Sequence, residues 1–245
     1  MLKRVSAFIF DFVLLITLIV GVALLLSAVV GYDAKVSEME SLYAEYSEKY
    51  GVNVGITAEG YESLTESERK TYEEAQKAFS EDPRAVNSTN LVMNLTLMIV
   101  TLSFLISYLI LEFAVPLFLK NGQTVGKKIF GIALMRDDGV KVTPVMLFVR
   151  SILGKCTIET LVPIFIAFLI LLGNAGIVGL LAILLLFVFE IGLIVKTNTN
   201  SCIHDILAYT VAVDFESQMI FDSKEDLIAY KEKIHAERVE NEKEQ

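Results

Sequence analysis

Four long apolar stretches constrain the fold of this 245-residue chain more than any other feature. The first, residues 5–30, would extend about 39 Å as a helix, enough to cross a bilayer with some tilt. Three more follow at residues 91–119, 158–172 and 177–195. Only helices and closed barrels satisfy their backbone hydrogen bonds in lipid, and the mean hydropathy of +0.57 is typical of membrane proteins. We therefore predict an all-α membrane protein built as a four-span transmembrane helical bundle.

The polar segments between these stretches divide the chain into six parts. They are a first transmembrane helix at 1–30, an acidic helical loop at 31–88, a second transmembrane helix at 89–119, a hairpin with an amphipathic helix at 120–156, third and fourth transmembrane helices at 157–195, and a charged tail at 196–245. The first stretch could instead be a cleaved signal peptide. It is longer than the apolar core of a signal peptide and contains an acidic residue, so we expect it to be retained.

The loop at 31–88 carries thirteen acidic and six basic residues. Residues 35–50 and 63–80 have helical composition, and Thr65 and Glu68 have the spacing of a capping box. We expect a small helical hairpin on the membrane surface. Nothing in its sequence demands a ligand.

The connection between the second and third spans is basic, and it mixes short apolar runs with charges. Residues 144–155 are interrupted by Arg150 and Lys155, a pattern that favours an interfacial amphipathic helix over a span. β-branched residues indicate short strands, at 129–135, 140–143 and 209–215. Asp138-Gly139 is a hairpin turn signal. We therefore expect a small β-hairpin or sheet beside the amphipathic helix.

Basic residues gather on one side of a four-span arrangement. They are Lys3, Arg4, Lys120, Lys127, Lys128, Arg136, Lys141, Arg150 and Lys155. Because short loops rich in Lys and Arg stay in the cytoplasm, this side is predicted to be cytoplasmic. The chain is then a multi-pass protein of the cell membrane with both termini inside and the acidic loop outside.

Four carboxylates lie at similar depth inside the apolar stretches: Asp11, Glu112, Glu159 and Glu190. A carboxylate in hydrocarbon costs about 2.5–3.5 kcal/mol on insertion scales, so these groups should face one another, water or a basic partner. Arg4, Arg150 and Lys155 are the nearest charge partners. A shared polar pocket that holds protons or a cation is one interpretation. The alternative is that the charges only lock the helices together.

The second span carries its own polar stripe. Asn94, Thr101, Tyr108 and Glu112 fall within about 40° of one another on a helix, so we expect this face to point into the bundle. Pro116 has no N–H to bond the Glu112 carbonyl, which predicts a kink and a free acceptor. These groups are candidates for a cation or proton site.

Other classes of function have little support. Cys156 and Cys202 lie on the predicted cytoplasmic side, where thiols stay reduced, and their spacing is not that of a metal site. No nucleophile–base pair and no basic stripe for phosphates is recognisable. We expect no enzyme activity, no cofactor, no metal and no nucleic-acid partner.

Two further segments carry a family resemblance. The first segment contains Gly122, Thr124, Gly126, Lys127 and Gly131. The second contains His204, Asp205 and Thr210. Together with Arg4 and Asp11, they resemble the RDD family of bacterial membrane proteins, which is named for one arginine and two aspartates. Arg4, Asp11 and Asp205 resemble the naming residues. The chain differs in having Ile206 where a basic residue is common and Tyr209 where glycine is common. The resemblance implies a multi-pass membrane protein, for which transport is the usual suggestion.

Taken as residues alone, these segments suggest modest roles. The Gly126-Lys127 pair is not part of a Walker A motif. We interpret this segment as a turn followed by basic residues at the start of a strand. His204 is a candidate for titration near neutral pH, and Asp205 for a gate or for a plain turn cap.

Two hypotheses remain open. The first is a transporter of cations or protons, with Asp11 and Glu112 facing the ion. The second is a non-transporting assembly protein whose extracellular loop binds another protein. The oligomeric state is not predicted.

Overall fold

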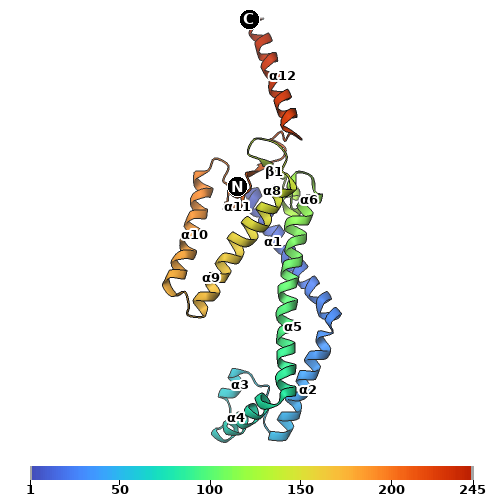
Figure 1. Ribbon diagram of the computed structural model, residues 1–245, viewed down its shortest axis with the longest axis vertical. Helices are drawn as coiled ribbons and strands as arrows, with labels where there is room; N and C mark the ends of the chain where they lie inside the picture. The colour runs from blue at the N-terminus through green and yellow to red at the C-terminus, as the bar shows by residue number, and fades with distance from the viewer. Residues whose placement is uncertain (1, 244–245) are drawn as a thin grey trace. The chain divides into compact units, whose positions relative to one another are not determined.

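The computed structural model describes residues 2–243, and it is mainly helical (Figure 1). Four helical stretches are long and apolar enough to cross a membrane: Leu2–Val30, Pro83–Phe118, Pro144–Leu171 and Gly176–Lys196. A two-stranded antiparallel sheet accompanies them. The predicted class, an α-helical membrane protein with four spans and a small sheet, is confirmed.

The chain folds into two compact units, and residues 16–107 form one of them. This unit, here called the helical unit, contains the end of α1 (Leu2–Val30), α2 (Tyr32–Tyr50), α3 (Ala58–Glu62), α4 (Glu66–Glu81) and most of α5 (Pro83–Tyr108). Its apolar core includes Leu42, Tyr46 and Phe79. Thr65 and Glu68 form the capping box expected at the start of α4, where the Thr65 N–H donates to the Glu68 carboxylate over 2.8 Å.

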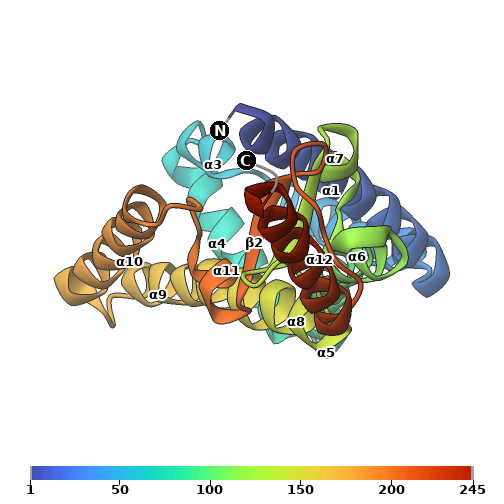
Figure 2. The same cartoon turned by 90° about the horizontal axis from the view of Figure 1, so that it is seen from above.

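Residues 2–15 and 108–243 form the other unit, here called the charged unit. Its elements after α5 are, in order, η1 (Leu109–Ala114), α6 (Val115–Phe118), η2 (Lys120–Gly122), α7 (Val125–Ile129), β1 (Ile132–Arg136), α8 (Pro144–Phe148), η3 (Val149–Leu161), α9 (Val162–Leu171), α10 (Gly176–Lys196), α11 (Ile203–Leu207), β2 (Thr210–Asp214) and α12 (Lys224–Lys243). Helices α9 and α10 form a hairpin and lie side by side in both views (Figures 1 and 2).

The sheet joins segments that are far apart in the chain. β1 pairs with β2, and the register runs from Ile132 opposite Asp214 to Arg136 opposite Thr210. The hairpin expected around Asp138-Gly139 is reduced to one bridge between Met135 and Lys141. Residues 140–143, which follow the turn, are too few to compete with β2 for pairing with β1, because a helix begins at Pro144. Side chains from α1, β1, α8 and β2 make the core beneath the sheet.

The third span also differs from the prediction. Residues 144–155 were expected to form an amphipathic helix separate from a span at 158–172, whereas α8, η3 and α9 form one continuous helical stretch. The reason is that Arg150 and Lys155 both find carboxylate partners within the protein. Their charges therefore do not need to rest at the membrane surface, and the helix can carry them inside.

Candidate functional site

Most of the sequence-predicted charges meet around one cavity of about 520 Å³ in the charged unit. Its charged and titratable lining residues are Arg4, Asp11, Glu112, Lys127, Arg150, Lys155, Glu159, Cys202, His204 and Asp205. They come from three of the four candidate spans and from connecting segments, and the fourth span contributes the apolar Ile194. This space is here called the charged cavity.

Arg150 and Asp205 form the most deeply buried ion pair, with 6% and 4% of their surfaces exposed. The guanidinium also donates to Thr210 Oγ1 at 2.7 Å and lies 3.0 Å from His204 Nε2. Burial alone would raise the pKa of Asp205, but the charge of Arg150 holds it below its ordinary value. Asp205 also accepts from the Cys202 N–H at the start of α11, so it both caps a helix and neutralises an arginine.

His204 connects α11 to the third span. Its backbone N–H donates to Glu159 Oε1 at 2.8 Å, and its Nδ1 lies 2.8 Å from the same carboxylate. Burial and the charge of Arg150 lower the pKa of His204 below its ordinary value, so the ring is neutral at pH 7. A neutral ring with its proton on Nδ1 can donate to Glu159 and accept from Arg150 through Nε2.

Glu112 is paired with Lys155, whose Nζ lies 2.5 Å from Oε1. The backbone here is π-helical, and the carbonyl predicted to be free because of Pro116 is not free. It accepts the Ser151 hydroxyl at 2.7 Å, while Tyr108 Oη donates to the Ser151 carbonyl at 2.8 Å. The expected unpaired acceptor is therefore wrong, because a small hydroxyl on the neighbouring helix replaces the missing N–H. Sequence reasoning missed Ser151.

Asp11 binds the segment that carries the glycine-rich motif. It accepts from Thr124 Oγ1 at 2.5 Å and from the Gly126 N–H at 2.7 Å. A Cβ at Gly126 would stand 2.4 Å from the Ala7 carbonyl oxygen and 2.9 Å from the Asp11 carboxyl carbon. Glycine is thus required for this loop to reach the first span.

Arg4 fixes the same span to the C-terminal segment. Its guanidinium donates to the carbonyls of Thr199, Asn200 and Ala212, at 3.0 Å for the first and 3.1 Å for the second. No described carboxylate is paired with it. Arg4, Asp11 and Asp205 are the residues that resemble the ones for which the RDD family is named. Each connects a different pair of chain segments around the charged cavity.

Two expectations about the polar groups are wrong. Asn94 and Thr101 are exposed, because the buried side of α5 at that level carries Ser103 and Ser107 instead. Glu190 does not line the charged cavity and lies against the Cys202 thiol and the Ile203 N–H. Asp11, Glu112 and Glu159 each bind a different donor, and Glu112 has Lys155 as its basic partner, one of the arrangements that the sequence left open.

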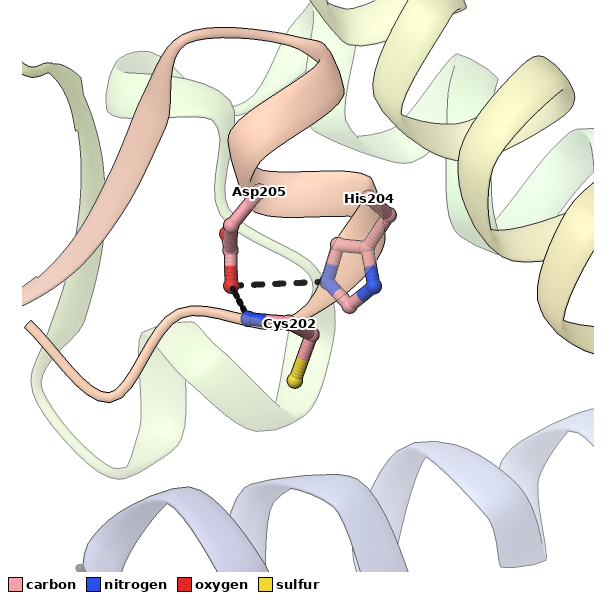
Figure 3. A group of neighbouring side chains, drawn as sticks. All are labelled: Cys202, His204 and Asp205. Atoms are coloured by element: carbon pink, nitrogen blue, oxygen red, sulfur yellow. Dashed lines mark hydrogen bonds and ion pairs between the residues drawn. The ribbon is translucent and has the colours of Figure 1, made fainter. Parts of the chain in front are cut away.

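Cys202, His204 and Asp205 place one potential metal-ligand atom each within 4.8 Å of the others (Figure 3). Their chemistry does not suit a metal. Asp205 is neutralised by Arg150, and that guanidinium also faces Nε2 of the histidine. Burial, followed by the charge of Asp205, raises the pKa of the Cys202 thiol to about 12, so the thiol is protonated at neutral pH. A metal would first have to expel the arginine.

Lys127 differs from the other cations of the charged cavity. It is half-buried on α7 and lines the cavity, yet its ammonium has no ion-pair or hydrogen-bond partner among the side chains described in residues 2–243. Burial and the charges of Arg150 and Lys155 lower its pKa to about 8. The sequence marked Lys127 as a motif residue but did not indicate that it enters the cavity.

Comparison with known proteins gives one match. The model of the RDD family matches residues 1–209, which include all four candidate spans and end one residue before β2. No curated protein and no solved structure matches the chain.

Proposed function

The chain belongs to the RDD family of membrane proteins, and from this premise we propose that it is a transporter exchanging a monovalent cation or a proton at Glu112. We further propose that it resides in the cell membrane with both termini in the cytoplasm. The basic residues near the charged cavity support this orientation, because Lys and Arg in short loops favour the cytoplasmic side.

The observation that carries the proposal is the Glu112–Lys155 pair. Glu112 lies in a candidate span with 7% of its surface exposed, and Lys155 supplies the cation that neutralises it. Ionisable groups in a span are costly to keep, which makes a functional role the default interpretation. The ammonium occupies the carboxylate as a bound monovalent cation would. An incoming cation or a proton would therefore compete with Lys155 for the same oxygens.

Proteoliposomes with opposed Na⁺, K⁺ and proton gradients test this proposal. Glu112→Gln keeps the shape of the side chain and removes the charge, so we expect cation-dependent flux to disappear. Glu216→Gln is the matched control, because Glu216 is an exposed acid after β2 and outside the cavity lining. Full flux through a folded Glu112→Gln protein would overturn the proposal.

A second candidate function rests on the helical unit. Residues 16–107 have an apolar core of their own and include the whole acidic loop, as expected of a module that binds a partner. In this alternative the protein is a membrane assembly factor, and the charges only lock the spans. It predicts that deleting residues 36–85 abolishes capture of a partner protein, while neither the wild type nor Glu112→Gln moves ions.

A further inference from the structure

Lys127 is a cation of the charged cavity that no described carboxylate binds directly. The charges of Glu112 and Asp11 raise the pKa of Lys127 without binding its ammonium directly. Glu112 is paired with Lys155, and Asp11 accepts from two neutral donors, the Thr124 hydroxyl and the Gly126 N–H. Arg150 and Lys155 add positive charge around it. An ammonium that is partly removed from water is stabilised by an opposite charge. The cavity is thus suited to an anion at Lys127.

The rest of the cavity wall is mainly apolar. It includes Val5, Phe8, Pro116, Leu147 and Ile194. Its volume of about 520 Å³ lies in the range of small-molecule sites, about 300–1,000 Å³. An inorganic anion would use the ammonium and leave this wall uncovered, whereas a ligand with an acyl chain would cover both.

The first span indicates where such a ligand enters. Val5 and Phe8 line the cavity and remain 51% and 59% exposed. They belong to a candidate span, so their exposed surfaces face the lipid in a bilayer. The apolar wall of the cavity therefore continues onto a lipid-facing surface, and a molecule dissolved in the bilayer can reach Lys127.

We propose that the charged cavity binds an anionic amphiphile, with the negative head at Lys127 and the chain along the apolar wall formed by Val5, Phe8 and Ile194. The head is a lipid phosphate or a fatty-acid carboxylate, since both offer oxygen acceptors to an ammonium. This inference does not depend on ion movement. It concerns Lys127, which no described acid binds directly, and not the Glu112–Lys155 pair.

Native mass spectrometry of the full chain in a neutral detergent at pH 7 tests the proposal. The probes are phosphatidylglycerol, oleate, phosphatidylcholine and inorganic phosphate. We expect one tightly bound molecule of phosphatidylglycerol or oleate, and the better of the two identifies the head. Phosphatidylcholine should bind at least about tenfold more weakly, because its own ammonium opposes Lys127. Equal binding of phosphatidylcholine, or binding of inorganic phosphate alone, would overturn the proposal.

A matched pair of lysine variants assigns the contact. Lys127→Met should weaken binding about tenfold. Lys128→Met should change it less than twofold, because Lys128 is the next residue on α7 and is exposed. Equal losses in the two variants would mean general surface attraction and would contradict a site at Lys127.

Lys127→Arg keeps the proposal testable if Lys127→Met does not fold. Arginine stays charged at every pH used. Lys127 instead has a pKa of about 8, and the charged groups that act on it are Asp11, Glu112, Arg150 and Lys155. Between pH 7 and pH 9.5 the wild type should lose about tenfold in affinity and Lys127→Arg should lose little. An equal loss in both would count against Lys127. Flux through Glu112 is read separately, so either proposal can fail while the other stands.

Discussion

The two units of this protein are stabilised in different ways. The helical unit has an apolar core around Phe79, and ion pairs such as Arg84–Glu45 lie on its surface. The charged unit instead buries ion pairs and places Arg150 and Asp205 at its centre. Exposed charges such as Lys35 and Glu38 in the helical unit can be changed without disturbing its core, while the charges of Arg150 and Asp205 are buried in the charged unit. The following predictions test this difference.

The largest effect should follow from Arg150→Met. The variant leaves Asp205 buried without its cation, and breaking a buried pair in this way costs about 3–5 kcal/mol. The measurement is unfolding of the purified protein in detergent. Lys35→Met in the helical unit is the control, and it should leave stability unchanged because both members of the Lys35–Glu38 pair are exposed.

A second variant separates lost charge from lost packing. Arg150→Met combined with Asp205→Leu removes both charges and should regain much of the stability, because no charge is then left unpaired. If the double variant is as unstable as Arg150→Met, then the packing and hydrogen bonds of Arg150 matter more than its charge.

Gly126→Ala should give the next largest loss. The new Cβ would stand 2.4 Å from a backbone oxygen of the first span, so the loop must move away and release Asp11. Overpacking of this kind costs about 1–3 kcal/mol. Gly21→Ala in the helical unit provides the comparison, since a Cβ there meets nothing within 4 Å. Equal behaviour of the two alanine variants would show that the close contact at Gly126 is not needed.

Acid should weaken the charged unit before the helical unit. The pKa of His204 is held below its ordinary value, so the unfolded chain binds a proton at a higher pH than the folded chain does. Stability is therefore complete above about pH 6.5 and falls as the pH drops below it. Residues 16–107 contain no histidine and should change little down to about pH 5.5.

Hydrogen exchange, corrected for its intrinsic pH dependence, measures both units at once. Protection of residues 203–214 should fall between pH 7.5 and 5.5, while protection of residues 66–81 should persist. In His204→Asn the fall should be flatter, because the group that gains a proton is gone. A parallel fall in both units of the wild type would contradict this assignment.

The sequence predicts the elements of this fold better than it predicts their contacts. Hydropathy over about 20 residues places three spans and the second half of the third, and the cost of a charge in lipid marks Asp11 and Glu112 as groups that need a partner. The same reasoning predicts Arg150 at the membrane surface, where the structure does not have it. The partners of these groups could not be predicted, because Asp11 meets Gly126 across 115 positions in the chain. Periodicity describes one helix at a time, and only tertiary packing decides which side of that helix is covered. The exposure of Asn94 is an example.

The smallest predicted effect lies at the turn before β2 and should be a gain. Tyr209 has a φ of +52° and is 70% exposed, so its side chain contributes little contact to a backbone shape that disfavours it. Glycine adopts this shape without a steric penalty, and Tyr209→Gly should add about 0.5–1 kcal/mol.

Gly131, at the entry to β1, offers the reciprocal test. Its φ is +66°, and a Cβ there meets nothing within 4 Å. Gly131→Ala therefore changes only the cost of this backbone conformation and should lower the free energy of unfolding by about 1 kcal/mol. Unfolding midpoints of the two variants should therefore move in opposite directions. A loss on Tyr209→Gly would mean that the tyrosine ring stabilises the charged unit through a contact outweighing its backbone strain, such as insertion at the lipid surface.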